Sequence, residues 1–236
     1  MNTLQFIDAG LSEYGATWEK QERLMKEIIG MKLANQRLPE NERLITPGYL
    51  LFVEHPPVYT LGKSGESQNL LLNSVQLAEK QISFYRTNRG GDITFHGPGQ
   101  LVCYPVLDLE NFGMGLRQYI YSMEESVIQA LARFEIMGSR DPDATGVWID
   151  VGLPTVRKIC AIGVKSSRHV TMHGFALNVN TDLNYFSYMH PCGITDKGVT
   201  SMQKELGMSV DFSQVKKTVL YCFLEIFDAK VNFSLP

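Results

Sequence analysis

The chain has 236 residues, of which 44% are hydrophobic and 20% charged, a composition typical of a globular protein with enough apolar material for one core. Its formal net charge of -3, from 22 basic and 25 acidic residues, excludes a global field that would attract nucleic acid or an anionic membrane. The stretches poor in apolar residues are too short to be linkers. We therefore expect a single domain over residues 1–236.

The N-terminal part of the chain predicts a strand, a long helix and then more strands. Residues 4–7 form a short apolar run, and apolar residues recur at helical spacing between Tyr14 and Leu33. Residues 48–55 and 58–62 are apolar and β-rich on either side of two prolines, which predicts a strand pair. A short helix over residues 73–80, capped by Asn73 or Ser74, precedes a strand over residues 82–86.

The remaining elements follow in the same alternating manner. Residues 101–109 predict a buried strand, in which Pro105 indicates a bulge or an edge position. Apolar spacing predicts a second long helix over residues 116–134 and a last helix over residues 212–227. Between them lie predicted strands over residues 146–150, 157–165 and 171–180. Strands clustered between helices indicate an α/β fold, a mixed sheet flanked by helices.

A glycine-rich segment, RGGDITFHGPGQ over residues 89–100, carries the densest chemical signal. Glycine clusters are costly to order and usually mark unusual backbone angles or close approach of the backbone to a ligand. Composition alone leaves an elaborate hairpin loop open, but Arg89, Thr94 and His96 favour a binding site. Nucleotide-binding motifs do not fit, because GxGxxG spacing is absent and Pro57 replaces the first glycine of a P-loop ending at Ser64.

Lys158 stands within the apolar run RKICAIGVK, residues 157–165. In a regular strand Lys158 would share one face with Cys160 and Ile162. A surface lysine on an edge strand is the alternative, because lysines are seldom buried. Further along, His173 precedes another apolar strand and has a similarly plain alternative, a core histidine whose hydrogen bonds are satisfied.

The four cysteines divide into two groups. Cys103, Cys160 and Cys222 lie in apolar runs, as small core residues do, whereas Cys192 lies in a loop between proline and glycine, as a nucleophile would. There is no CxxC pair, so we expect no metal. The N-terminus lacks a basic and then apolar leader, and no apolar run reaches the ~18 residues of a membrane span. We therefore expect a cytoplasmic protein with free thiols.

Four motifs in sequence order resemble the lipoyl(octanoyl) transferase family: RGGDITFHGPGQLVCYPVLDL, RKICAIGV, HGFALNVNTDL and PCGITDKGVTSM. The resemblance runs from about residue 51 to residue 206 and implies the biotin/lipoate protein ligase catalytic fold. It also implies an acyltransferase without a cofactor, which moves an octanoyl or lipoyl group from acyl carrier protein to a lysine. The implied acceptors are the lipoyl domains of 2-oxoacid dehydrogenase E2 subunits and the glycine cleavage H protein.

The resemblance also implies a role for individual residues. The acyl-thioester cysteine of the family corresponds to Cys192, and the lysine that lowers its pKa corresponds to Lys158. The implied substrate-lining residues are Arg89, Gly90, Gly91, Asp92, Ile93, Thr94, Phe95, His96, Ala161, Ile162, Gly163, Gly174, Phe175 and Ala176. Backbone amides near Gly174 and Ala176 are candidates for binding the oxyanion of the tetrahedral intermediate.

Two other functions remain open. An ATP-dependent lipoate or biotin protein ligase would share the fold and need a lysine, although it would not need the cysteine of the PCG element. A catalytically inactive module that binds acylated proteins is the second alternative. We also expect the basic residues to form a docking face for an acidic carrier protein, unless they are an ordinary solvated set: Arg86, Arg89, Arg157, Lys165 and Arg168.

Overall fold

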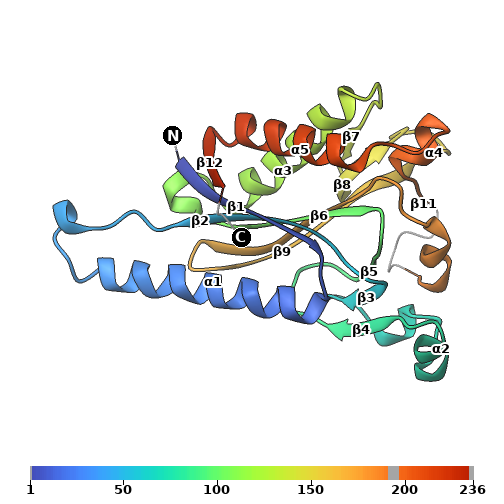
Figure 1. Ribbon diagram of the computed structural model, residues 1–236, viewed down its shortest axis with the longest axis horizontal. Coiled ribbons are helices and arrows are strands. Elements are labelled where there is room, and N and C mark those ends of the chain that lie inside the picture. Colours follow the sequence, from blue (N-terminus) through green and yellow to red (C-terminus); the bar gives the residue numbers. More distant parts are fainter. Residues whose placement is uncertain (1, 191–196, 234–236) are drawn as a thin grey trace.

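A computed structural model of the protein describes residues 2–190 and 197–233. Figure 1 shows three layers, in which a central sheet lies between one long helix and a pair of helices. The single helix is α1 (Tyr14–Asn35), and the pair consists of α3 (Leu116–Ala132) and α5 (Phe212–Ile226). The predicted mixed sheet flanked by helices is therefore confirmed. In the described residues, no helix combines the length and apolar character needed to cross a bilayer.

The large sheet is mixed. Its strands are β1 (Asn2–Leu11), β2 (Gly48–Glu54), β6 (Gln100–Val106), β7 (Ser139–Asp141), β8 (Ala144–Ile149), β9 (Arg157–Ser167), β10 (Val170–Asn178), β11 (Gly198–Val199) and β12 (Ala229–Phe233). Their order is β12-β1-β2-β6-β10-β9-β8-β7, and β11 pairs with β9. The pairs of β1 with β12 and β2, and of β11 with β9, are parallel, and the others are antiparallel.

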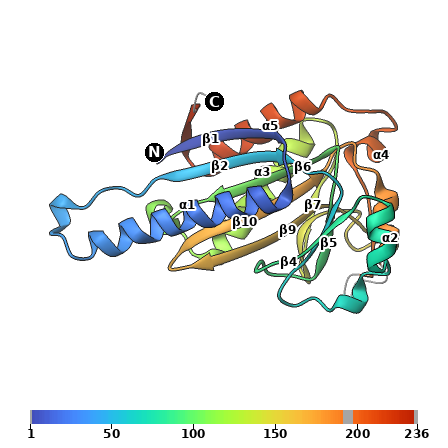
Figure 2. The same cartoon turned by 60° about the horizontal axis from the view of Figure 1, so that its bottom comes forward.

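A smaller sheet lies beside the N-terminal end of α1, as Figures 1 and 2 show. It contains β3 (Val58–Leu61), β4 (Ser83–Arg86) and β5 (Ile93–His96), with β3 in the centre. The prediction that residues 48–55 and 58–62 pair with each other is wrong, because β2 and β3 belong to different sheets. The chain changes sheets at the prolines after His55, which cannot continue a ladder.

Two short helices complete the chain. The helix α2 (Ser74–Glu79) begins with the predicted cap, because the Asn73 side chain accepts from the backbone N–H of Gln76 and the Gln76 side chain accepts from that of Asn73. This reciprocal pair is a capping box. The other short helix is α4 (Met202–Leu206), whose cap is Ser201.

Alternating residues of the central strands pack on opposite faces of the large sheet. One face packs against α3 and α5 through a core that includes Leu101, Cys103, Phe175, Leu177, Val127 and Phe223. The other face packs against α1 through a second core that includes Val102, Tyr104, Ala176, Leu24 and Ile28. The second face is the one on which the candidate site forms, because Ala176 belongs to this core and also lines the cavity described below.

Pro105 lies in an interior strand, so the predicted edge position is wrong. It pairs with Leu50 on β2, while the ladder between β6 and β10 ends at the pair Cys103 and Phe175. Continuing that register would place His173 opposite Pro105, and His173 has a φ of 59°. Proline has no N–H, so it cannot donate a hydrogen bond to β10 at this position. The regular pairing of β10 with β6 therefore stops before His173. His173 leaves the regular strand conformation at this point.

Gly174 and Gly30 provide a matched test of how closely the strands pack. A Cβ at Gly174 would lie 2.1 Å from the backbone oxygen of Cys103, whereas a Cβ at Gly30, on an exposed face of α1, would meet no atom within 4 Å. We expect Gly174→Ala to lower the free energy of unfolding by about 1–3 kcal/mol because β10 and β6 must separate. We expect Gly30→Ala to raise it by about 0.5–1 kcal/mol. Urea unfolding measures both, and wild-type stability of Gly174→Ala would contradict this packing.

Candidate active site

A cavity of about 550 Å³ lies between the large sheet and the small sheet. Segments that are far apart in the sequence contribute lining residues, among them Arg89, Gly91, Asp92, Ile93 and Thr94, then Lys158, Ala161 and Ile162, and Ala176. Met189 and Lys197, the cavity residues nearest to the undescribed segment on its two sides, line it as well. The cavity therefore brings together residues from all four motifs, since Lys197 belongs to the fourth. Cys192, also of the fourth motif, lies outside the described residues.

A smaller pocket of about 50 Å³ adjoins this cavity and shares Arg89, Thr94, Ala161, Ile162 and Ala176 with it. Its remaining lining residues are Tyr14, His96, Val102, Tyr104, Gly163, His173, Gly174 and Phe175. Together the two cavities contain every described residue that the resemblance implied, except Gly90 and Phe95.

Gly90 and Phe95 support the site from behind. The backbone N–H of Gly90 donates to the oxygen of Val164 at 2.9 Å and so fixes the glycine-rich loop to β9. The ring of Phe95 is buried and stacks on Tyr185, with 4.4 Å between the ring centroids. These two residues shape the cavity wall without facing it.

The glycines of the loop allow one backbone to approach another. The N–H groups of Gly62 and Ser64 donate to the oxygens of Asp92 and Gly91 at 3.1 and 3.2 Å. A Cβ at Gly62 would lie only 2.2 Å from the oxygen of Gly91. These amides of the GKS sequence are therefore occupied by the neighbouring loop, which agrees with the exclusion of a phosphate-binding loop.

Arg89 is buried and links two segments of the chain through hydrogen bonds. Its side chain is buried, and its Nη2 donates to the backbone oxygen of Thr60 at 2.6 Å while Nε donates to the Thr60 hydroxyl at 3.2 Å. Burial lowers the pKa of Arg89. The guanidinium joins the glycine-rich loop to β3 and forms part of the wall that both cavities share.

Lys158 reaches the cavity because β9 contains a bulge. The register between β8 and β9 shifts from Val147 with Cys160 to Trp148 with Lys158, so Ile159 is an extra residue in β9. Ile159 and Cys160 are both buried in the core under α3, and Lys158 lines the cavity with Ala161. Two interpretations were therefore wrong: Lys158 does not share a face with Cys160, and β9 is not an edge strand.

The surroundings of Lys158 lower the pKa of its amine. The side chain is half-buried, and Nζ lies 4.4 Å from the centroid of the Trp148 ring. Burial lowers the pKa of Lys158, because an ammonium loses hydration there. Lys197 lowers it further, while Cys160, Asp141 and Glu124 act in the opposite direction. A half-buried amine of this kind can exchange protons at lower pH than an ordinary lysine.

His55 and His96 have tautomers that their partners define. The Nδ1 of His55 lies 2.6 Å from the backbone oxygen of Ser12 and must donate to it, so Nε2 accepts from the Tyr104 hydroxyl at 2.9 Å. The Nδ1 of His96 donates to Oε1 of Gln100 at 2.8 Å. Burial lowers the pKa of His55 to about 4 and that of His96 to about 3.

His173 is buried but only half satisfied. Its Nε2 donates to the side-chain oxygen of Asn88 at 2.8 Å, and burial lowers its pKa to about 3. Among the residues that the structure describes, its Nδ1 is a buried atom with no hydrogen-bond partner. The interpretation of His173 as a fully satisfied core histidine is therefore wrong, and a lone pair of this ring remains available beside the small pocket.

The sequence analysis missed Tyr14 and Tyr104, which line the small pocket with the histidines. The ring of Tyr14 stacks on His96 with 5.9 Å between centroids, and burial raises the pKa of Tyr14 to about 12. These side chains come from the start of α1, from β5 and from β6. Their proximity arises only in the folded chain, so no local sequence pattern could have marked them.

The expected oxyanion amide of Ala176 lies inside the sheet. Ala176 pairs with Val102 on β6 and with Ala161 on β9. A backbone N–H in a strand with neighbours on both sides points along the sheet toward one of them. The geometry therefore does not favour Ala176 as an oxyanion donor.

The expected basic docking face does not form. Arg89 is buried, and Arg157 is bound by two acidic residues, with Nε donating to Glu205 at 2.7 Å and a further ion pair to Asp150. Arg168 lines a different cavity, described next. The five basic residues therefore do not form one exposed face, since Arg89 is buried and Arg168 lines a separate cavity.

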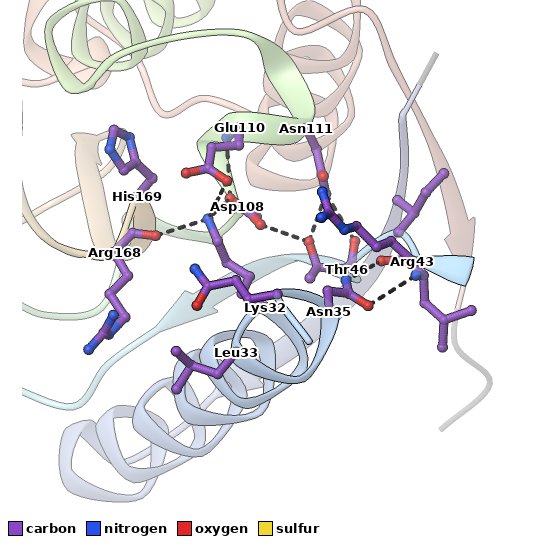
Figure 3. Close-up of a pocket in the computed structure, with 13 residues that line it drawn as sticks. Lys32, Leu33, Asn35, Arg43, Thr46, Asp108, Glu110, Asn111, Arg168 and His169 are labelled. Atoms are coloured by element: carbon purple, nitrogen blue, oxygen red, sulfur yellow. Dashed lines mark hydrogen bonds and ion pairs between the residues drawn. The ribbon is translucent and has the colours of Figure 1, made fainter. Parts of the chain in front are cut away.

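That other cavity, of about 580 Å³, lies near the C-terminal end of α1 (Figure 3). Lys32 reaches across it. Its Nζ lies 2.6 Å from the carboxylate of Asp108, which is buried, and 3.0 Å from the carboxylate of Glu110, which is exposed. Asp108 also accepts from the Thr46 hydroxyl at 3.0 Å. Because Lys32, Asp108 and Thr46 bind one another, we interpret this cluster as a structural contact that joins α1 to the loops of the large sheet.

A half-buried amine beside a cavity with apolar walls defines the chain as a candidate for acyl or acid–base chemistry. Residues 13–224 match the family model described as the lipoyl protein ligase A/B catalytic domain, and the chain belongs to this family.

Relatives and a solved structure agree with this assignment. The chain is 52% identical over 230 residues to an octanoyltransferase of Flavobacterium psychrophilum, covering 97% of this chain and 98% of the relative. It is 53% identical over 229 residues to an octanoyltransferase of Flavobacterium johnsoniae, with the same coverage of 97% and 98%. A solved structure of a bi-partite lipoate protein ligase and its E2 lipoyl domain from Thermoplasma acidophilum has a TM-score of 0.70 at 14% identity, covering 99% of this chain and 87% of that one. The predicted family, fold and enzyme class, an acyltransferase, are confirmed.

The buried histidines make stability depend on pH. Their folded-state pKa values of about 3 to 4 lie below the unfolded value of ~6.5, so the unfolded chain binds more protons between these limits. Stability is therefore present above pH ~6.5 and is lost as the pH falls toward 4, by up to about 1.4 kcal/mol per pH unit for each histidine. Between pH 7 and pH 5, the free energy of unfolding should therefore fall by about 2 kcal/mol less in His96→Gln than in the wild type. Urea unfolding at the two pH values measures this difference.

His169 is the matched control for this experiment, because it is exposed. His169→Gln should keep the pH dependence of the wild type. If His96→Gln also kept it, the buried neutral state of His96 would be disproved.

Proposed function

We propose that the protein transfers an octanoyl group, or a lipoyl group, from acyl carrier protein to a lysine of a lipoyl domain. The acceptors are E2 subunits of 2-oxoacid dehydrogenases and the glycine cleavage H protein, and residues 1–236 act as one cytoplasmic domain. The transfer proceeds through an acyl thioester on Cys192, with Lys158 as its partner. The observation that carries the proposal is the half-buried Lys158 amine in a cavity that is bounded by Met189 and Lys197.

Cys192 is the nucleophile in this proposal. Cys103, Cys160 and Cys222 are buried, and burial raises the pKa of each of these thiols. A thiol in that state is a poor nucleophile. Cys192 stands three residues after Met189 in the sequence, and three residues of chain span about 10 Å at most. The proposal therefore needs no long-range movement to bring its sulfur to the cavity.

The first step is attack of the Cys192 thiolate on the carbonyl carbon of the donor thioester. A free thiol of pKa ~8.5 is mostly protonated at pH 7, and lowering this value by about 2 units requires ~2.7 kcal/mol of thiolate stabilisation. One ammonium about 4 Å away supplies ~4 kcal/mol at an effective dielectric near 20. The Lys158 ammonium is therefore sufficient. The C–S bond of the donor breaks with its electron pair, and the carrier leaves as a thiolate that takes up a proton from water.

The second step uses Lys158 in its other protonation state. Acylation removes the thiolate, so the Lys158 ammonium is left half-buried without this partner, and burial lowers its pKa. Neutral Lys158 then takes a proton from the incoming lysine amine as that nitrogen attacks the acyl carbonyl. The bond to Cys192 breaks with its electron pair, and an amide forms on the acceptor.

The walls of the cavity suit an acyl chain. Ala161, Ile162 and Ala176 line it from the large sheet, and Phe186 and Met189 line it from the segment after β10. Small and apolar side chains of this kind bury methylene groups favourably, at about 0.8 kcal/mol per group.

Cys192→Ser tests the acyl-enzyme. We expect the wild type, incubated with octanoyl acyl carrier protein, to gain one octanoyl group in an intact mass spectrum, and we expect Cys192→Ser to gain none. Cys222→Ser is the control and should acylate normally, because Cys222 is buried in the core. A persistent mass increment in Cys192→Ser would place the nucleophile elsewhere.

Lys158→Ala tests the partner. We expect alkylation of Cys192 by iodoacetamide to need a higher pH in Lys158→Ala, because the thiolate loses its neighbouring ammonium. Lys165→Ala is the control, because Lys165 lies on the same strand and lines neither the cavity nor the small pocket. An alkylation profile that Lys158→Ala leaves unchanged would remove Lys158 from the first step.

Two assays separate the alternatives. Release of pyrophosphate from ATP in the presence of free octanoate or lipoate would indicate an ATP-dependent ligase, and we expect none. Transfer of the octanoyl group from acyl carrier protein to an isolated lipoyl domain would exclude an inactive binding module.

A further inference from the structure

The amine of Lys158 shares its aromatic neighbour with a second lysine. The Nζ of Lys158 lies 4.4 Å from the centroid of the Trp148 ring, and the Nζ of Lys197 lies 5.0 Å from it. The ring is held in place, because it is buried and its Nε1–H donates to the backbone oxygen of Ala144 at 2.8 Å. Two cations on one fixed ring repel each other unless one of them has a counterion.

Lys197 has such a counterion. Its ammonium forms an ion pair with Asp141, and only 5% of the Asp141 side chain is exposed. The attraction of Lys158 also acts on Asp141, although more weakly than that of Lys197. A buried carboxylate that loses its partner is strongly destabilised and takes the next cation within reach.

The backbone fixes the relative position of the two lysines. Asp141, Trp148 and Lys158 lie on the adjacent strands β7, β8 and β9. Lys197 directly precedes β11, in which Val199 pairs with Lys158, and the Thr200 N–H donates to the backbone oxygen of Lys158 at 2.9 Å. The sheet therefore fixes the backbone positions from which these side chains meet.

The other charged or titratable groups around Lys158 have partners of their own. Glu124 on α3 accepts from the Gly146 N–H at 2.9 Å and lies 3.2 Å from Nε of Arg140. The Cys160 thiol on β9 is buried, and its raised pKa keeps it neutral. Asp143 lines the same cavity but is exposed, and its backbone N–H donates to Asp141 at 2.9 Å. Asp141 and Lys197 are the ion pair that adjoins the ring shared with Lys158.

We propose that Asp141 and Lys197 are positioning residues for Lys158: Lys197 occupies the Asp141 carboxylate, so that the Lys158 amine stays free of an ion pair with Asp141 and available for proton transfer. This proposal rests on the role of Lys158 in the proposed function. It extends that role by naming the groups that set the charge of the amine before and after acylation.

The two halves of the ion pair should act in opposite directions. In Lys197→Met the Asp141 carboxylate is left to Lys158, which favours the ammonium form of Lys158. In Asp141→Asn the Lys197 ammonium remains without its counterion beside Lys158, which favours the neutral amine. A merely structural role of the pair would change both variants in the same direction.

Peptide-resolved labelling of lysines tests this directly in the full-length protein. The purified variants are labelled with acetic anhydride over a range of pH, and the rate at Lys158 is read by mass spectrometry. We expect the labelling midpoint of Lys158 to move to higher pH in Lys197→Met and to lower pH in Asp141→Asn. At pH 8 the Lys158 labelling rate should fall about 5- to 10-fold in Lys197→Met.

Two further variants keep the result interpretable. Lys197→Arg keeps the charge and should label like the wild type, and Lys204→Met removes an exposed lysine of α4 and should also leave Lys158 unchanged. Shifts of Lys197→Met and Asp141→Asn in the same direction, or no shift in either, would overturn the proposal. So would a Lys197→Arg variant that behaves like Lys197→Met.

The labelling experiment is independent of acyl transfer. If the midpoints move as expected but the protein forms no acyl-enzyme, the proposed function fails and the electrostatic role of Asp141 and Lys197 stands. If the protein forms an acyl-enzyme but the midpoints do not move, only the present inference fails.

Discussion

Holding a lysine amine partly out of water, beside a cavity with both apolar and polar walls, is the constraint on which the candidate site depends. An ammonium loses hydration when it is buried, so the fold must either supply a counterion or favour the neutral amine. In this protein the Lys158 side chain lies against the Trp148 ring, and the Asp141 carboxylate, which also attracts Lys158, is paired with Lys197. The amine thus has a lowered pKa, and it forms no ion pair with the carboxylates that the structure describes. Such an amine is suited to alternate between charged and neutral forms during a two-step transfer.

The sheet makes this arrangement possible through local departures from regular strand geometry. The bulge at Ile159 turns Lys158 out of the core and into the cavity. At Pro105 the ladder between β6 and β10 is interrupted, and His173 takes up a positive φ beside the small pocket. Irregularities of this kind cost stability, and they occur preferentially where a side chain must be redirected. Both of them lie next to the same pair of cavities.

Much of the fold could be predicted from the sequence, because local periodicity determines local elements. The three long helices and the strands β8, β9 and β10 lie close to their predicted ranges, and the cap at Asn73 was also predicted. The pairing of strands was less predictable. Two β-rich runs separated by prolines look like a hairpin, although β2 and β3 enter different sheets. A choice of this kind depends on contacts with distant strands, which a local pattern does not contain.

The candidate site divides in the same way. The resemblance to a family predicted a set of functional residues, and the folded chain brings many of them to one cavity: Arg89, Gly91, Asp92, Ile93, Thr94, Lys158, Ala161, Ile162 and Ala176. The predicted face of β9 on which the Lys158 side chain lies was wrong, because that face depends on a bulge that exists only when β9 pairs with β8. The tyrosines and the pairing of Asp141 with Lys197 were missed, since their partners lie tens of residues away in the sequence.

The central claim is that an acyl chain bound to Cys192 occupies the cavity beside Lys158. A crystal structure of the protein after reaction with octanoyl acyl carrier protein tests it most directly. The account predicts electron density that continues from the Cys192 sulfur into the cavity between Ala161 and Ala176, with the thioester near the Lys158 amine. Density attached to another residue, or a chain that lies outside this cavity, would contradict the account.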